Sequence, residues 1–325
     1  MMVIVKTPFR VSLFGGGSDY KEYYLKYGGA VIGGSINKYA YLNIRKLPPF
    51  FDYKYRVVYS KIESTTKVED IEHKAVRGIL KYYNQTYLSI NYDADLPARS
   101  GIGSSSSFVV GLINGIYALN KKIVTKEELA KEAIYVEQKV LKENVGSQDQ
   151  TFASYGGFNY IEFLQNGEII VNKICNKNII ELQENLMLFF SGISRVSSNI
   201  VKKQIEKIEI NRKKIDKMKE LANLAYKYII ENRIDEIGEM LDYYWCLKKS
   251  LDENISTPII DEMYEKAKKS GAIGGKVLGG GGGGFVLLYV PKKFHLKVRE
   301  ALKDYVYVPF KFEYEGSSLI FCKDC

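Results

Sequence analysis

Cysteine is scarce in this sequence, and long apolar runs are absent. The 325 residues include four cysteines. Cys175 and Cys246 stand alone, and the closing pair Cys322 and Cys325 lacks the second pair that a four-ligand zinc site needs. We therefore expect free thiols and no structural zinc. No apolar stretch reaches membrane-spanning length, and the few apolar residues before Lys6 are too few for a secretory signal. These absences predict a cytoplasmic protein with no membrane partner.

Segments that bind nucleic acids are also missing, although the net charge is positive. The formal charge is +9 at pH 7. The lysines are scattered along the chain, and there is no dense basic arm or recognised nucleic-acid motif. We expect no nucleic-acid partner. The surplus then reflects either general lysine usage or an anionic small-molecule substrate.

The composition and the order of the predicted elements indicate a globular protein of two lobes. Apolar residues make up 46% of the chain and charged residues 26%, which suits substantial cores. Repeats and low-complexity linkers are absent. Short strand patterns dominate the first half, at residues 3–5, 11–14, 40–47 and 55–60. Helical patterns dominate the second half, and an earlier helix begins at a capping box of Thr125 and Glu128. This order predicts an α+β fold of two interlocked lobes.

The stretch "LPARSGIGSSSSFVVGLING", residues 96–115, raises the first functional question. Gly/Ser-rich stretches are usually linkers, but this one runs from a predicted strand into an apolar helix. A loop entering a helix N-terminus directs backbone N–H groups into one small volume, and this arrangement favours an anion such as phosphate. The four serines 104–107 add donors, and one hydroxyl can also bind Mg²⁺. Because no Gly-Lys-Ser/Thr follows, the loop is not a P-loop. An ordinary helix-capping loop is the alternative.

Two further glycine-rich loops flank the chain. Gly279–Gly284 interrupts a strand pattern that resumes at Phe285. Glycines in a strand context indicate that a ligand or another backbone approaches closely. We therefore expect a tight hairpin packed against the phosphate loop rather than a spacer. Near the N-terminus, Gly15–Gly17 forms a turn followed by the hydrogen-bonding side chains of Ser18, Asp19 and Tyr20, for which a simple Asx turn is the alternative.

In their order and spacing, the three loops resemble the motifs of the GHMP kinase superfamily, which includes galactokinase, homoserine kinase, mevalonate kinase and phosphomevalonate kinase. The matching segments are Pro8-Phe9-Arg10, Pro97 to Ser105, and Gly274 to Gly284. The resemblance implies the GHMP kinase fold. Its N-terminal lobe, here expected at residues 1–175, carries a ribosomal-protein-S5-like left-handed βαβ phosphate loop. Its C-terminal lobe, here expected at 176–325, is ferredoxin-like.

The resemblance also implies a site for ATP and Mg²⁺. Glu137 and Asp149 stand at the spacing of the superfamily's metal-binding Glu and catalytic Asp, whereas in isolation they would be a solvated charge and a helix cap. The implied roles are proton acceptor for Asp149, orientation of that group for Arg10, and magnesium binding for Glu137 with Ser105. The ATP phosphates are assigned to Gly101, Gly103, Ser104, Ser105 and Ser106, and the substrate to Gly16, Gly17, Asp19, Gly281 and Gly282.

The N-terminal motif separates the sugar kinases of this superfamily. Galactokinases carry a Glu-His pair where Gly16 and Gly17 stand here. "TPFRVSLFGGGSDYKEYY" and "VGSQDQTFASYGG" instead resemble the D-glycero-D-manno-heptose 7-phosphate kinases. Such enzymes phosphorylate the anomeric C1 hydroxyl and give the 1,7-bisphosphate used for nucleotide-activated heptose synthesis. Arg195, inside the serine-rich segment 191–198, is a candidate for the 7-phosphate, with an ordinary surface arginine as the alternative.

Two other functions stay open at this point. One is a kinase for a non-phosphorylated sugar such as fucose or another hexose. The other is a non-catalytic regulator that binds nucleotide or sugar, which would be expected to have lost Asp149, Glu137 or Ser105. All three residues are present, and this favours an enzyme whose partners are ATP and a sugar phosphate. The oligomeric state, monomer or homodimer, is left open.

Overall fold

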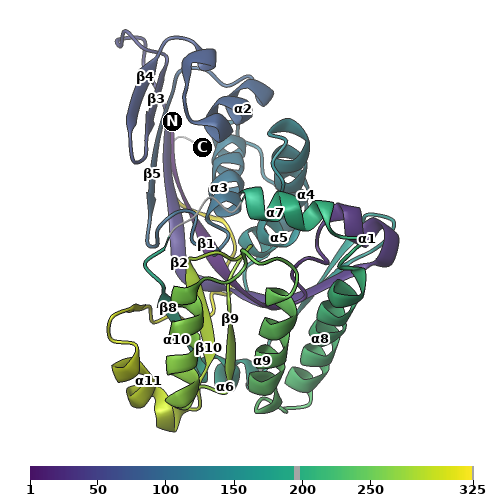
Figure 1. The fold of residues 1–325 in the computed structure, drawn as a ribbon. Coiled ribbons are helices and arrows are strands. Elements are labelled where there is room, and N and C mark those ends of the chain that lie inside the picture. The colour runs from purple at the N-terminus through teal and green to yellow at the C-terminus, as the bar shows by residue number, and fades with distance from the viewer. Residues whose placement is uncertain (194–197, 324–325) are drawn as a thin grey trace.

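Two β-sheets organise the molecule, shown in Figure 1 as a computed structural model that describes residues 1–193 and 198–323. The larger sheet has eight strands in the order β12-β1-β2-β5-β3-β4, with β6 added to β2 and β7 to β6, and the smaller sheet has the order β11-β8-β10-β9. Among the strand pairs of the described residues, only β3 and β5 run parallel. The bounds of the strands are β1 Met2–Phe14, β2 Gly29–Lys46, β3 Tyr55–Val58, β4 Ile62–Thr65, β5 Leu88–Ala94, β6 Phe158–Phe163, β7 Ile169–Lys173, β8 Leu186–Phe190, β9 Gly274–Val277, β10 Phe285–Tyr289, β11 Val306–Tyr307 and β12 Ser318–Lys323.

Helices cover both sheets and confirm the predicted α+β architecture. Helix α3 packs on β1 and β2, α8 reaches the same two strands, and α9 packs on β9. The bounds of the helices are α1 Lys21–Tyr27, α2 Lys74–Tyr82, α3 Ser104–Leu119, α4 Lys126–Tyr135, α5 Gln148–Tyr155, α6 Asn178–Glu184, α7 Ser198–Glu206, α8 Arg212–Ile230, α9 Glu236–Lys249, α10 Pro258–Lys269 and α11 His295–Ala301. A π-helical turn, Val136–Val140, continues α4, and the capping box of Thr125 and Glu128 is confirmed.

The first strand differs from its prediction. Residues 3–5 and 11–14 belong to one continuous strand, β1, which passes through Pro8. Its register against β2 shifts between Pro8 and Phe9, because proline has no N–H to donate to the ladder. At the other end of the chain, β12 pairs with β1. The last strand therefore returns to the sheet built by the first half, and a lobe boundary at residue 175 remains a prediction.

Strand β1 joins the two main apolar cores. Val3 and Val5 lie in a core shared with α2, α3 and β5. Val11 and Leu13 lie in a second core with the smaller sheet and helices α8 to α11. Arg10 sits on the same strand at the junction and is 4% exposed. The strand thereby carries a buried cation to the place where the two cores meet.

The glycine-rich hairpin packs against the phosphate loop, as predicted. Strands β9 and β10 pair antiparallel on either side of the glycines, and the Phe285 amide donates to the Ser100 carbonyl at 3.1 Å. Gly101 has φ +85°, and a Cβ there would lie 2.4 Å from the carbonyl oxygen of Leu278. A Cβ on Gly279 would lie 2.6 Å from the Gly101 Cα. The two backbones therefore meet without room for a side chain.

Two expectations from the sequence concern the cysteines and helices that could span a membrane. Cys175 and Cys246 are free and exposed, whereas Cys322 takes part in a disulfide, so the expectation of free thiols is wrong for Cys322. Over residues 1–193 and 198–323, helices long and apolar enough to cross a bilayer do not occur.

The contact between the two glycine loops predicts an unequal cost for two Gly→Ala substitutions. Gly101→Ala combines backbone strain with a steric clash, and we expect it to lower the free energy of unfolding by about 2–4 kcal/mol. Gly192 also has a positive φ, +78°, but a Cβ there would have no atom of the described residues within 4 Å. Gly192→Ala should therefore cost only about 1 kcal/mol. Urea unfolding followed by circular dichroism measures both, and equal losses would contradict the close packing.

Candidate active site

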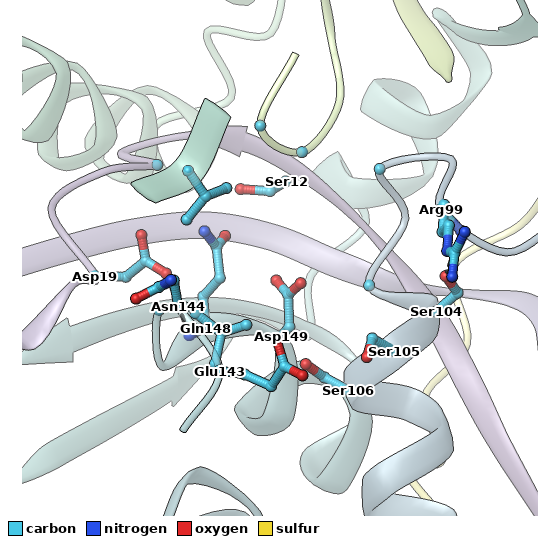
Figure 2. A pocket seen from close by; sticks show the side chains of 18 of the residues that line it. Ser12, Asp19, Arg99, Ser104, Ser105, Ser106, Glu143, Asn144, Gln148 and Asp149 are labelled. Atoms are coloured by element: carbon cyan, nitrogen blue, oxygen red, sulfur yellow. Dashed lines mark hydrogen bonds between the residues drawn. The ribbon is translucent and has the colours of Figure 1, made fainter. Parts of the chain in front are cut away.

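A cavity of about 980 Å³ lies where the loops converge. Its walls come from β1, the start of α3, the start of α5, α9 and β9, so both sheets contribute. Figure 2 shows Ser104, Ser105 and Ser106 along one side, Asp149 at the centre and Asp19 toward the other side. The volume is in the range of pockets that enclose organic ligands.

Arg10 and Asp149 form a two-point ion pair in this cavity. Arg10 Nε donates to Asp149 Oδ1 and Nη2 donates to Oδ2, both at 2.9 Å. The third guanidinium nitrogen, Nη1, donates to the Gly101 carbonyl at 2.5 Å. The paired geometry fixes the carboxylate in orientation. The Asp149 side chain keeps 25% exposure, so the carboxylate can still reach a ligand in the cavity.

The serine-rich loop ends at an open helix N-terminus. Gly103 caps α3 in the left-handed conformation, and the first intrahelical bond runs from the Ser107 amide to the Gly103 carbonyl at 2.9 Å. The amides of Ser104, Ser105 and Ser106 precede that bond and have no intrahelical acceptor. All five residues assigned to the ATP phosphates line the cavity, namely Gly101, Gly103, Ser104, Ser105 and Ser106. This side of the cavity, which we call the serine wall, is suited to an anion.

Glu137 lies beneath the serine wall, on the π-helical turn, and is fully buried. Its Oε2 accepts from the Ser106 hydroxyl at 2.7 Å and from the Gln150 amide, while Oε1 has no hydrogen-bond partner within the described residues. Burial raises the pKa of Glu137 to about 7. An unpaired, buried carboxylate oxygen and a neighbouring hydroxyl oxygen are ligands that a hard cation such as Mg²⁺ prefers.

The serine next to Glu137 differs from the one expected. The resemblance pairs Glu137 with Ser105, but the structure places the Ser106 hydroxyl there and leaves Ser105 exposed. Successive residues on an α-helix point about 100° apart, so only one of the two serines faces Glu137. The hydroxyl that contacts Glu137 is therefore that of Ser106, whereas Ser105 lines the cavity, and the expected magnesium role of Ser105 remains a prediction.

Asp19 marks the opposite side of the cavity and is 2% exposed. It accepts from the Gly17 amide at 3.0 Å and from the Gln148 amide at 3.4 Å. Burial, followed by the charge of Asp149, raises its pKa. Gly16 and Gly17 line the cavity beside it. Where the galactokinase motif has two large side chains, this chain leaves space next to a hydrogen-bonding carboxyl group.

Two residues expected at the substrate, Gly281 and Gly282, do not line the cavity. Gly281 and Gly282 pack against Ile255, whose carbonyl accepts from the Gly282 amide at 2.9 Å. Their backbone faces the interior of the lobe, and Gly279 and Gly280 line the cavity in their place. Arg195 lies outside the described residues, so its candidate role is not tested.

The cavity also contains residues that no motif assigned. At the Asp19 end these are Ser12, Tyr244, Lys248 and Lys276. Of these, Lys276 follows two glycines inside the C-terminal glycine-rich motif, whereas Tyr244 and Lys248 stand in an ordinary helical pattern. At the opposite end, beyond the serine wall, several of the lining residues are aromatic.

That aromatic end has Phe108 at its centre. The Phe108 ring lies 5.1 Å from the rings of Tyr92 and His73, measured between centroids. Tyr59 also lines the cavity, as do the charged residues Glu72, Lys74 and Arg99. The flat faces of these aromatic side chains suit a planar ring. The aromatic content of the chain, 13%, is the sequence feature that could have indicated them.

Comparison with known proteins agrees with this geometry. Residues 71–157 match the family described as GHMP kinases N terminal domain, and residues 225–307 match GHMP kinases C terminal. The chain is 31% identical over 328 residues to D-glycero-alpha-D-manno-heptose 7-phosphate kinase of Campylobacter jejuni, with 96% of each protein covered. It is 24% identical over 223 residues to the bifunctional fucokinase/GDP-fucose pyrophosphorylase of Arabidopsis thaliana, covering 66% of this chain and 21% of that protein.

A solved structure gives the same result for the whole chain. The crystal structure of a D-glycero-D-manno-heptose 1-phosphate kinase from Bacteriodes thetaiotaomicron matches with a TM-score of 0.80 and 26% identity over 100% of both chains. Fold, loop order and sequence similarity thus extend over nearly all of the molecule. The chain belongs to the GHMP kinase family and is an ATP-dependent sugar kinase.

Proposed function

We propose that this kinase transfers the γ-phosphoryl group of ATP to the anomeric C1 hydroxyl of D-glycero-D-manno-heptose 7-phosphate and forms the 1,7-bisphosphate. The proposal rests on the residues at the Asp19 end of the cavity, which we call the acceptor end. Gly16 and Gly17 leave room there, Asp19 offers a carboxyl group for sugar hydroxyls, and buried cations stand close by. The relative that shares 31% identity over 96% of this chain is named for the same acceptor.

The reaction follows from positioning and charge. The nucleobase lies at the aromatic end, and the phosphates lie along the amides at the start of α3. As the acceptor oxygen bonds to the γ-phosphorus, its proton passes to Asp149, the bond to the β-phosphate oxygen breaks, and ADP leaves. Arg10 holds Asp149 at two points and places its positive charge beside the developing negative charge.

Mg²⁺ fits the unpaired carboxylate oxygen of Glu137 and the Ser106 hydroxyl beside it. When bound, the ion would neutralise phosphate charge during the transfer. Ser106 lines the cavity and contacts Glu137, so it links the phosphate wall to the buried acid. Gln150 holds Glu137 from the other side.

A kinase for a non-phosphorylated sugar is the second candidate. The similarity to a fucokinase over 66% of this chain favours it. The matching protein from Bacteriodes thetaiotaomicron is named for heptose 1-phosphate, which makes that sugar phosphate a further acceptor to compare. A non-catalytic regulator is disfavoured, because Asp149 lines the cavity and is held at two points by Arg10, and because Glu137 Oε1 has no hydrogen-bond partner in the described residues.

The acceptor is tested by coupled ADP release with ATP and Mg²⁺. The panel is D-glycero-D-manno-heptose 7-phosphate, D-glycero-D-manno-heptose 1-phosphate, the unphosphorylated heptose, fucose and galactose. We expect kcat/KM to be highest for the 7-phosphate, with phosphorus NMR showing the new phosphate at C1. Turnover confined to an unphosphorylated sugar would overturn the proposed acceptor and support the second candidate.

Removing the proton acceptor should separate binding from chemistry. Asp149→Asn keeps the shape of the side chain but cannot take the proton, so we expect kcat to fall by on the order of 10²–10⁴-fold. Affinity for ATP, measured by calorimetry, should stay within about threefold, because Asp149 lies at the acceptor side of the serine wall. Near-normal turnover of this variant would refute the assigned role.

The two serines give a matched test of the magnesium site. Ser106→Ala removes the hydroxyl that contacts Glu137, and we expect the Mg²⁺ concentration for half-maximal activity to rise by about tenfold. Ser105→Ala removes an exposed hydroxyl one residue earlier and should change it by less than about threefold. The reverse order would return the metal to Ser105, as the family motif implies.

A further inference from the structure

Two lysines at the acceptor end are buried, and neither forms a salt bridge within the described residues. Lys248 on α9 is 6% exposed and Lys276 on β9 is 2% exposed. Burying an unpaired cation is costly, and the mechanism above assigns neither lysine a task. Both line the same cavity as Arg10 and Asp19.

Within the described residues, each ammonium group has one N–H that is not donated to a hydrogen-bond acceptor. Lys248 Nζ donates to the carbonyls of Val277 and Gly279, at 2.8 and 2.6 Å. Lys276 Nζ donates to the carbonyls of Ser12 and Leu13, at 2.9 and 3.0 Å. An ammonium group has three donors, so each lysine is fixed by two bonds to main chain and keeps a third donor. The two side chains are thereby held rigidly in place.

Further unpaired hydroxyls stand beside Lys276. Its Nζ lies 4.4 Å from the centre of the Tyr244 ring. The Ser12 hydroxyl is buried without a hydrogen-bond partner in the described chain, and Figure 2 shows it pointing into the pocket. The Tyr244 hydroxyl, also buried, lies against Gly16 and makes no well-formed hydrogen bond there. Ammonium N–H groups and free hydroxyls together form a donor-rich patch, which suits an anionic oxygen ligand.

The charges around this patch favour the same ligand. Arg10 and Asp149 neutralise each other as an ion pair. Burial, followed by the charges of Lys248 and Arg10, lowers the pKa of Lys276, whereas the charge of Asp19 raises it. Burial and then the charge of Arg10 lower the pKa of Lys248 to about 7. An incoming dianion would relieve this repulsion among the cations.

We propose that Lys248 and Lys276, with the Ser12 hydroxyl, form a second phosphoryl-binding subsite, separate from the serine wall at the start of α3. Resting on the proposed function, the subsite takes the phosphate that the acceptor sugar already carries. The same chemistry would also hold the phosphoryl group in transfer. If the subsite binds the phosphate of the acceptor sugar, the lysines determine KM for the phosphorylated acceptor. If it binds the phosphoryl group in transfer, they determine kcat.

The test uses two acceptors that differ only in the phosphate, D-glycero-D-manno-heptose 7-phosphate and the free heptose. In Lys248→Met and Lys276→Met we expect KM for the phosphorylated acceptor to rise by on the order of tenfold or more. KM for the free heptose should stay within about twofold. A fall in kcat with both acceptors, at unchanged KM, assigns the subsite to the group in transfer. Unchanged parameters, or an equal rise in KM for both acceptors, overturn the subsite.

Lys268 provides the control for simple loss of a structural lysine. Its Nζ also donates to a main-chain carbonyl, that of Ile273 at 2.6 Å, and it pairs with Asp242 rather than lining the cavity. Lys268→Met should leave both KM values unchanged. Failure of the proposed function is seen separately, in the wild-type enzyme, as absent turnover of the heptose 7-phosphate. In that case, kcat of the two lysine variants with whichever sugar the wild-type enzyme phosphorylates still tests whether the lysines bind the phosphoryl group in transfer.

A pH series on the wild-type enzyme avoids the risk that a variant does not fold. Lys248 has a lowered pKa near 7 in the free protein, so its ammonium form is present below that pH and is lost as the pH rises through it. The charged groups that face it are Arg10 on β1 and Lys276 on β9. KM for the phosphorylated acceptor, a dianion above about pH 6, should rise between pH 7 and 9. KM for the free heptose should not, and parallel behaviour of the two would contradict the subsite.

Discussion

The ion pair between Arg10 and Asp149 is the interaction on which the site depends. It joins β1, in the first sheet, to the start of α5, and through Arg10 Nη1 it also holds the Gly101 carbonyl of the phosphate loop. A single guanidinium group thus fixes both the proton acceptor and the loop that faces the phosphates. Because the Arg10 side chain is 5% exposed, solvent does little to weaken these bonds.

Close backbone packing places the rest of the cavity around that pair. Gly101 meets Leu278 and Gly279 without space for a Cβ, so the hairpin of the smaller sheet rests directly on the phosphate loop. Lys248 then ties the hairpin to α9 through the carbonyls of Val277 and Gly279. A displacement of either lobe would move the serine wall relative to Asp149. The acceptor and ATP are therefore held by elements that are distant in sequence but fixed against one another.

Local patterns in the sequence were sufficient to predict much of this arrangement. The capping box at Thr125, the α+β order and the packing of the glycine hairpin were all predicted and are confirmed. Long-range pairing was not predictable in the same way. The return of β12 to β1 has no local signal, and the two halves of β1 looked separate because Pro8 interrupts the pattern.

Some residues of the site could not be identified from the sequence motifs, because their position depends on the three-dimensional packing. A motif identifies the serine run but does not tell which hydroxyl faces Glu137, since that depends on the helical phase of α3. The motif also does not distinguish the glycines that line the cavity from Gly281 and Gly282, which pack on Ile255. Lys248 and Tyr244 were missed because burial against a cavity, rather than spacing along the chain, distinguishes them from other helix residues.

A double-mutant cycle on kcat tests the central claim that Arg10 and Asp149 act as one unit. The cycle compares Arg10→Met, Asp149→Asn and the double variant in steady-state experiments with saturating ATP and acceptor. If the pair acts as a unit, the second substitution adds little, and the double variant turns over about as slowly as the slower single variant. Losses that multiply, so that the logarithms of the two single effects add, would show independent roles and contradict the account.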